Sequence, residues 1–286
     1  MNTDGIDVPA SRELARIAEV AARATADRLR GAFRSRPEVL HKRDFHDPVT
    51  EHDRAAEETI REVLERHWPG GAVVGEEGGA DGAGGVDDRD GGVRWYVDPI
   101  DGTANFAAGL PFFCTSIGAV ADGRVVAGVV YDPVRDDLFS ASLGGAECNG
   151  EPLRSAGAER DRGAVLLTGF PNARDLRRDG EAALERYGAL VESFATLRRP
   201  GSAALCLAHV AAGWADAAYG TSVNAWDVAA ALLLVRQAGG TYLPLGGAPG
   251  GNEWDAPGYV ACVGGFDLAG SALAGVAGLA PAGDPT

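Results

Sequence analysis

Apolar residues recur with helical spacing in the first part of the chain. Within residues 11–34 they fall on one helical face, and Ser11 is positioned to cap that helix. A second apolar stripe follows a capping-box-like start at Thr50 and ends at Pro69. We therefore predict one helix over residues 11–34 and a second between Thr50 and the Pro69 turn.

The middle of the chain has the pattern of strands. The turn Ala121-Asp122-Gly123 predicts that two of these strands form a hairpin. Residues 78–92 are mostly glycine and aspartate with almost nothing apolar, so we expect a mobile surface loop there. The predicted strands cover residues 72–75, 93–98, 115–121, 124–131 and 137–142.

Helices and strands alternate after Gly144, and such alternation in blocks favours a layered α/β arrangement. We divide the chain into an N-terminal α+β half, residues 1–144, and a C-terminal α/β half, residues 145–286, packed as one compact unit. Predicted helices in the second half cover residues 179–195, 202–213, 227–238 and 267–278, and predicted strands cover 165–168, 216–219, 241–243 and 258–263.

The composition excludes several classes of partner. The 286 residues carry a formal net charge of −15, whereas nucleic acids and anionic membranes attract basic surfaces. No apolar run approaches the length of a membrane helix or resembles a secretory signal. The four cysteines form no C-x-x-C pair, which is typical of a reduced, cytoplasmic protein. We expect no nucleic acid, no membrane and a cytoplasmic location.

The segment from Trp95 to Phe106 carries the strongest chemical signal. Asp98 and Asp101 lie three residues apart behind a mostly apolar strand, which we expect Pro99 to end just past Asp98. Hard divalent cations prefer such carboxylate ligands, and a Gly-Thr turn that opens a helix offers N–H groups to a phosphate. The segment therefore indicates metal-assisted phosphoryl chemistry.

Other motifs are candidates for the same site, although each has an ordinary structural explanation. Asp227 starts an alanine-rich helix and has the position of a cap. Glu76 and Glu77 follow a strand, as solvated turn residues do, and residues 201–204 read as a cap followed by good helix formers.

Convergence of these acids would change the interpretation. If Glu76, Asp98, Asp101 and Asp227 meet, two like charges 4 Å apart cost roughly 4 kcal/mol at a surface-like dielectric. Bound cations remove that cost, so convergence implies a metal site.

The acidic motifs and their order resemble the inositol monophosphatase family of Mg²⁺-dependent, lithium-sensitive phosphatases. The resemblance spans roughly residues 12–265 and implies a layered αβαβα sugar-phosphatase fold, phosphoric monoester hydrolysis and a homodimer. The matched segments are Gly75-Glu76-Glu77, Asp98-Pro99-Ile100-Asp101-Gly102-Thr103, Gly109-Leu110-Pro111, Trp226-Asp227-Val228-Ala229-Ala230 with Gly239-Gly240, and, after Lys42, the spaced residues Asp47, Val49, Thr50 and Asp53.

The resemblance also implies the metal ligands. Glu76 and Asp98, with the carbonyl of Ile100, would hold the first ion. Asp98, Asp101 and Asp227 would hold the second, so that Asp98 bridges the two. Two or three Mg²⁺ ions are expected, and Mn²⁺ would substitute for them.

The remaining roles follow from the same resemblance. Asp53 and Thr103, with Glu76, would orient and deprotonate the attacking water. Lys42, the only lysine in the chain, would lie near the metals and the phosphate. The residues expected to bind the substrate, a small phosphorylated metabolite, are Lys42, Asp101, Gly102, Thr103, Gly201, Ser202, Ala203 and Asp227.

One departure from the family concerns the substrate. Inositol-specific members carry a glutamate seven residues before the Trp-Asp aspartate, and this chain has Gly220 there. We expect a pocket wider by one side chain, so inositol does not follow as the substrate. Inositol 1-phosphate, other sugar, cyclitol or metabolite phosphates, histidinol phosphate and sugar bisphosphates stay open.

Two other classes of protein are alternatives. Haloacid-dehalogenase-type phosphatases need one residue between the two carboxylates of an Asp-x-Asp-Gly-Thr motif, whereas Pro99 and Ile100 both intervene here. Some bacterial members of the resembled family act in RNA-related regulation. A non-catalytic regulatory binding protein that retains the fold is therefore the second alternative, against which the net negative charge counts.

Overall fold

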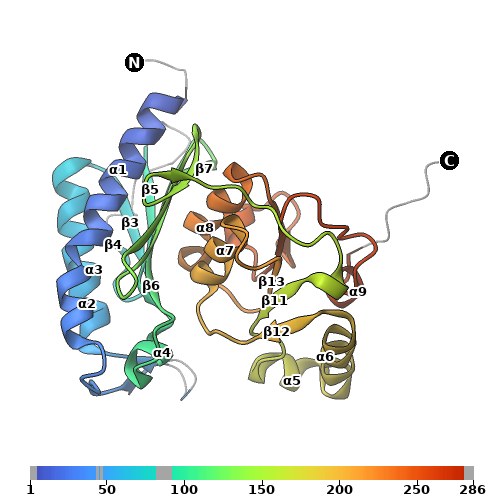
Figure 1. The fold of residues 1–286 in the computed structure, drawn as a ribbon. Coiled ribbons are helices and arrows are strands. Elements are labelled where there is room, and N and C mark those ends of the chain that lie inside the picture. Colours follow the sequence, from blue (N-terminus) through green and yellow to red (C-terminus); the bar gives the residue numbers. More distant parts are fainter. Residues whose placement is uncertain (1–4, 43–44, 46–47, 82–91, 280–286) are drawn as a thin grey trace.

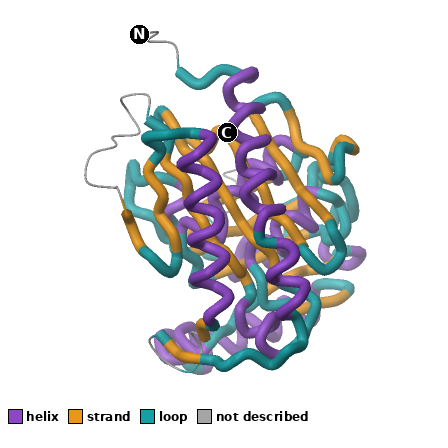
Figure 2. Tube along the Cα trace, turned by 90° about the vertical axis from the view of Figure 1, so that its left-hand side faces the viewer, coloured by secondary structure: helices purple, strands orange, loops and turns teal. Residues whose placement is uncertain are grey.

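Helices and two large sheets alternate in five layers in the computed structural model, which describes residues 5–42, 45, 48–81 and 92–279 (Figure 1). Helices α1 and α3 cover the outer face of an eight-stranded sheet and lie side by side in front of it in Figure 2. Helices α7 and α8 fill the layer between this sheet and a five-stranded sheet, and α5, α6 and α9 lie beyond the second sheet. This is the predicted layered αβαβα arrangement.

The nine α-helices of the described residues account for the outer and middle layers. Two predicted helices, 11–34 and 179–195, are divided in the structure, and two others, 202–213 and 267–278, are shorter. The bounds are α1 (Val8–Ala24), α2 (Ala26–Ala32), α3 (Glu51–His67), α4 (Thr103–Ala108), α5 (Ala173–Asp179), α6 (Glu181–Ser193), α7 (Ala203–Ala211), α8 (Ala225–Gln237) and α9 (Ala272–Val276).

The eight-stranded sheet has the order β10-β9-β8-β7-β6-β5-β3-β4, with β3 and β5 parallel and the other pairs antiparallel. The predicted hairpin joins β6 to β7, where Ala121 pairs with Arg124. The strands are β3 (Ala72–Gly75), β4 (Gly79–Asp81), β5 (Arg94–Asp101), β6 (Cys114–Ala121), β7 (Arg124–Asp132), β8 (Asp137–Ser142), β9 (Gly145–Cys148) and β10 (Glu151–Pro152).

The five-stranded sheet has the order β12-β11-β13-β15-β14, with parallel pairing from β12 to β13 and antiparallel pairing beyond. A separate two-stranded sheet pairs β1 (Leu40–His41) with β2 (Pro48–Val49). The strands of the five-stranded sheet are β11 (Val165–Thr168), β12 (Thr196–Arg198), β13 (Ala217–Gly220), β14 (Thr241–Leu245) and β15 (Gly258–Cys262). The division at residue 144 stays a prediction; β9 and β10 join the first sheet from beyond it.

The single N-terminal helix that we predicted is wrong in two respects. It divides at Thr25, whose hydroxyl donates to the carbonyl of Ala22 at 2.8 Å. Asp7, not Ser11, caps α1, because its carboxylate accepts from the N–H of Ala10. Ser11 is buried within the helix and donates to the carbonyl of Val126 on β7, so this hydroxyl joins α1 to the sheet.

Two further predictions need correction. The segment 179–195 is interrupted at Gly180, which has a φ of +56° and separates α5 from α6. Within the predicted loop 78–92, residues 79–81 form the edge strand β4; residues 82–91 lie outside the described residues. The short strands β1, β2, β9, β10 and β12 were not predicted.

A pair of glycines lets α8 approach the first sheet closely. Gly118 on β6 and Gly128 on β7 are directly opposed. A Cβ at Gly118 would lie 2.8 Å from the nitrogen of Ala230, and one at Gly128 only 2.4 Å from its carbonyl oxygen. Because no side chain fits between helix and strands, the backbone of α8 is held against the sheet, and its first turn is brought to the end of β5.

Burial of His209 predicts a loss of stability in mild acid. This α7 side chain packs on Phe112 and Trp214, with ring centroids 5.3 and 5.1 Å away. Burial, and then the charge of Arg135, lower its pKa to about 4, although Asp132 acts in the opposite direction. The unfolded chain takes up the proton near pH 6.5 and the folded chain only near pH 4, so stability falls as the pH drops through that range.

We expect the free energy of unfolding to fall by about 2 kcal/mol more between pH 7 and pH 5 in the wild type than in His209→Phe. Urea denaturation at both pH values measures this difference, since every other titrating group is common to the two proteins. Equal pH dependence in the two proteins would show that folding does not lower the pKa of His209.

Candidate active site

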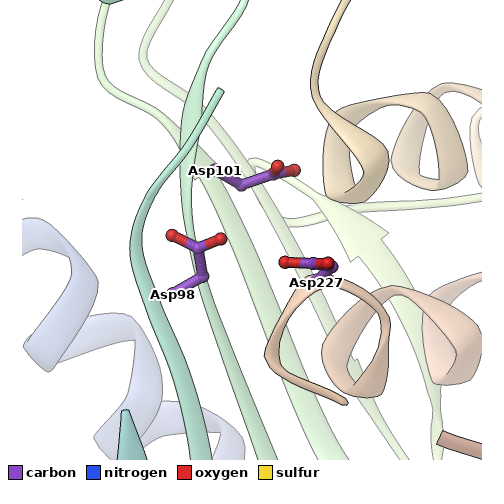
Figure 3. A group of neighbouring side chains, drawn as sticks. All are labelled: Asp98, Asp101 and Asp227. Carbon is purple, nitrogen blue, oxygen red and sulfur yellow. The ribbon is translucent and has the colours of Figure 1, made fainter. Parts of the chain in front are cut away.

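Three aspartates from two elements converge at the end of β5 (Figure 3). Asp98 and Asp101 belong to β5, and Asp227 belongs to the first turn of α8. One carboxylate oxygen from each lies within 4.8 Å of the other two. Asp98 and Asp101 are buried and Asp227 is half-buried, so water screens their charges poorly.

An irregularity in β5 brings Asp98 and Asp101 to one site. We predicted that Pro99 ends the strand, which is wrong: β5 continues to Asp101, and its pairing with β6 shifts register between the two aspartates. In a regular strand, residues three apart point to opposite faces. A bulge at the proline, which cannot donate to the ladder, removes that opposition and turns both carboxylates toward α8.

Each of these carboxylates is held by a backbone N–H. The Oδ1 atom of Asp98 accepts from the N–H of Ile100 at 3.0 Å. Asp227 is not the N-cap that we expected, because Asn224 occupies that position. Asp227 is the third residue of α8, and one of its oxygens accepts from the N–H of Asn224 at 2.7 Å, which completes a capping box while Asp227 takes part in the cluster.

Asp101 is held across the two halves of the chain. Its Oδ2 accepts from the hydroxyl of Ser202 and from the N–H of Ala204, both at 2.6 Å, at the start of α7. With one oxygen fixed in each carboxylate, the other is fixed as well. The cluster is therefore preorganised.

The electrostatics of the cluster favour a bound cation. Burial raises the pKa of Asp98 well above its usual range, and repulsion from Glu76, Asp101 and Asp227 raises it further. Burial also raises the pKa of Asp101 to about 6 against the opposing hydrogen bonds from Ser202 and α7. Among ion pairs between described residues, none involves Asp98, Asp101 or Asp227. An all-oxygen donor set without a protein counter-charge fits a hard divalent cation.

Glu76 lies beside this cluster and not within it. Its Oε1 accepts from Lys42 Nζ at 2.9 Å, and the same ammonium contacts Glu77. Burial opposes the charge on Lys42, but the two glutamates outweigh it and raise the pKa of the ammonium. The sole lysine of the chain thus lies at the predicted site, paired with carboxylates.

Glu57 is a residue that sequence reasoning missed. Buried on α3, it accepts from the N–H groups of Glu77 and Gly78 at 2.8 and 2.9 Å and pairs with Arg61 at 2.8 Å. It thereby holds the turn that presents Glu76. The available signal was its position four residues after Asp53, which puts both acids on one face of the helix.

Asp53 and Thr103 meet as predicted from their family roles. The Thr103 hydroxyl lies 2.9 Å from Asp53 Oδ1 and 3.0 Å from the carbonyl oxygen of Ile100. The other oxygen of Asp53 accepts from the N–H and hydroxyl of Thr50, which completes the predicted capping box of α3. Burial raises the pKa of Asp53 despite these hydrogen bonds. Asp47, predicted in the same motif, lies outside the described residues.

The predicted substrate-binding turns also come together. Gly102, with a φ of +96°, opens α4, and a Cβ there would lie 3.3 Å from the carbonyl oxygen of Gly201. Asn105 joins the two turns, since its amide donates to the carbonyls of Phe112 and Pro200 at 2.7 and 2.6 Å. This cross-link between the two halves was not predicted from the sequence.

A cavity of about 150 Å³ adjoins the cluster. Its lining includes Gly201, Ser202 and Ala203 from the start of α7, together with Gly220 and Tyr259. The expected widening at Gly220 is wrong: the Tyr259 ring fills the space, with its Cε1 2.6 Å from where a Cβ of residue 220 would lie.

The five layers, the carboxylate cluster and the adjoining cavity define a layered α/β protein with a candidate divalent-cation site. Comparison with known protein families shows to which family the chain belongs. The model of the "Inositol monophosphatase family" matches residues 10–273, and the chain belongs to that family. The predicted resemblance is thereby confirmed, and the acidic cluster agrees with the metal dependence of the family.

Individual relatives support the assignment. The "Nus factor SuhB" of Pseudomonas aeruginosa is 45% identical over 205 residues, which cover 70% of this chain and 73% of that protein. The crystal structure of the extragenic suppressor protein suhB of Bartonella henselae superposes with a TM-score of 0.78 at 32% identity, covering 88% of this chain and 94% of the other. The inositol monophosphatase of Anabaena (Nostoc) sp. PCC 7120 gives a TM-score of 0.74 at 32% identity, covering 89% and 92%.

Among the described residues, no helix has the length and apolar character needed to cross a membrane.

Proposed function

We propose that this protein hydrolyses a small phosphate monoester with the help of Mg²⁺. The observation that carries the proposal is the convergence of Asp98, Asp101 and Asp227 beside a cavity of about 150 Å³, whose wall includes Ser202, the hydroxyl donor to Asp101. Two or three ions would be held by Asp98, Asp101, Asp227, Glu76 and the carbonyl of Ile100, with Mn²⁺ as a substitute. Lithium inhibition, a cytoplasmic location and a homodimer are part of the same proposal and rest on the family.

The bound ions would neutralise the carboxylates, activate the attacking water and stabilise the leaving alkoxide. The protein's own residues would supply positioning and proton transfer. Because the hydrogen of the Thr103 hydroxyl is directed at Asp53 or at the Ile100 carbonyl, the Thr103 oxygen is left to accept from water. Asp53 would then take the proton through Thr103, and its raised pKa makes it the better base.

The phosphate would lie between the two helix starts. The N–H groups of Gly102 and Thr103, at the first turn of α4, would donate hydrogen bonds to the phosphate oxygens. Lys42 would contribute positive charge nearby. Gly201 to Ala203 would contact the alcohol, since they line the cavity beside Asp101. In-line hydrolysis of this kind requires no covalent intermediate.

A second function has support from the relatives, several of which are named Nus factor SuhB. A regulatory binding role, with or without catalysis, is therefore the alternative. A phosphate-release screen over phosphorylated metabolites, with Mg²⁺ and with EDTA, tests the first function. RNA binding titrated with salt tests the second, since contacts to phosphates weaken steeply with salt. If Mg²⁺ promotes the hydrolysis of none of the esters in the panel, the phosphatase proposal is contradicted.

Replacing Thr103 separates orientation of the water from binding. We expect Thr103→Ala to lower kcat by about a hundredfold with little change in KM, because a proton-transfer contact matters most in the transition state. Thr103→Ser is the matched control, since it keeps the hydroxyl, and should retain most activity. Steady-state kinetics at saturating Mg²⁺ measure both. An unchanged kcat with a raised KM would reduce Thr103 to a binding residue.

A further inference from the structure

Tyr259 occupies the space through which a side chain at residue 220 would reach the substrate cavity. Gly220 on β13 and Tyr259 on β15 are direct partners in the antiparallel ladder. A Cβ at residue 220 would lie 2.6 Å from Cε1 of Tyr259 and 3.1 Å from its Cζ. Residue 220 therefore has room only for glycine while the ring is in place.

The ring is fixed in that position. Tyr259 is 3% exposed and stacks on Tyr242, with ring centroids 5.8 Å apart and planes 17° from parallel. The turn beyond Gly220 is tied to the same strand region, because the N–H of Val223 donates to the carbonyl of Pro257 at 3.0 Å. The aromatic surface is thus part of the cavity wall, and its movement would disturb two packed rings and a turn.

Elsewhere in the lining of the cavity, the side chains of Thr168, Asn172, Ser202 and Thr221 already make hydrogen bonds within the protein, whereas the hydroxyls of Ser222 and Tyr219 have no hydrogen-bond partner among the described residues. The lining includes no charged side chain. The hydroxyl of Thr168 already donates to the carbonyl of Tyr219, that of Thr221 to Asp175, and that of Ser202 to Asp101. Burial raises the pKa of the Tyr259 phenol well above its usual value, so this side chain stays neutral.

We propose that Tyr259 determines the specificity of this site and selects phosphate monoesters of uncharged alcohols that present carbon, not several hydroxyls, to the cavity. The inference rests on the proposed phosphatase function. A carboxylate at residue 220 would accept hydrogen bonds from substrate hydroxyls or pair with an ammonium group. An aromatic face does neither, and it leaves buried hydroxyls without partners while it packs well against carbon.

Two matched pairs of esters test the proposal on the full-length wild type with Mg²⁺. Cyclohexyl phosphate and inositol 1-phosphate share a six-membered carbon ring and differ in hydroxyls. Propyl phosphate and 2-aminoethyl phosphate differ in a terminal methyl against an ammonium group. We expect kcat/KM to be at least tenfold higher for the first member of each pair. A preference for inositol 1-phosphate or for the ammonium ester would overturn the inference.

Variants locate the effect on Tyr259. Because Gly220→Glu alone collides with the ring, we expect it to lower the melting temperature. The double variant Gly220→Glu/Tyr259→Ala makes room for the carboxylate and should shift the inositol-to-cyclohexyl ratio at least tenfold toward inositol 1-phosphate. Tyr242→Phe is the matched control: it alters the neighbouring stacked ring, which does not line the cavity, and should leave the ratio unchanged.

A folded, active double variant with an unchanged ratio would overturn the inference; if that variant does not fold, the wild-type ratios decide. Failure of the inference is distinguishable from failure of the proposed function. If the protein hydrolyses p-nitrophenyl phosphate with Mg²⁺ but prefers inositol 1-phosphate or the ammonium ester within the matched pairs, only the role of Tyr259 is overturned. The absence of hydrolysis for every ester overturns the phosphatase function itself.

Discussion

Asp98→Asn should lower kcat/KM by at least about a hundredfold while it makes the metal-free protein more stable. Asparagine keeps an oxygen for the N–H of Ile100, so the bulge in β5 is retained. The variant loses a negative charge that would serve as a ligand to both ions. The same charge repels Asp101 and Asp227 when no cation is bound, and its removal relieves a cost of roughly 4 kcal/mol per close pair at most.

Kinetics with Mg²⁺ and thermal unfolding in EDTA at pH 8 measure the two effects, and we expect the metal-free melting temperature to rise by a few degrees. Asp216→Asn is the matched control. This buried aspartate lies outside the cluster and accepts from the N–H groups of Ala158 and Val165 at 2.6 and 2.7 Å. An amide there should lower stability and leave kcat unchanged. Activity of Asp98→Asn within tenfold of the wild type would remove Asp98 as a bridging ligand.

The layered fold was predictable from the sequence because long apolar stripes and short β-branched runs each carry a period. The site was predictable for a different reason. Asp98, Asp101 and Asp227 are short acidic side chains at the ends of apolar elements. A capping or turn role would explain any one of them, but it does not explain why all three occur. The order of the motifs then indicated the family, which the family match confirms.

The features that could not be predicted from the sequence depend on contacts between helices and strands that are distant in the chain, or on local irregularities within them. The division at Thr25 and the bulge past Asp98 are local irregularities that preserve the overall hydrophobic pattern. The role of Glu57 depends on a turn twenty residues away, and Gly118 and Gly128 depend on the path of α8. Gly220 is the clearest case. Its missing side chain predicted an open pocket, and a residue 39 positions later fills the space through strand pairing.

Removal of divalent cations should abolish the proposed activity and leave the repulsion between the carboxylates of the cluster without a compensating charge. We expect activity in excess EDTA below about one-thousandth of that with Mg²⁺, since neither the leaving alkoxide nor the attacking water is stabilised otherwise. Mg²⁺ or Mn²⁺ should restore it. Activity at the full rate in EDTA would rule out the mechanism.

The effect of Mg²⁺ on stability should depend on pH in a definite direction. In the metal-free protein the aspartate pKa values are raised, that of Asp101 to about 6, so the folded state holds protons that the unfolded state releases near pH 4. The contribution of these aspartates to metal-free stability is therefore fully present below pH 4 and is lost as the pH rises through 6. Cations compete with those protons for the same oxygens. The rise in melting temperature on adding Mg²⁺ should be larger at pH 8 than at pH 5.5 and much smaller in Asp98→Asn. An equal rise at both pH values would mean that Mg²⁺ does not bind at this cluster, because binding there competes with protons released in that range.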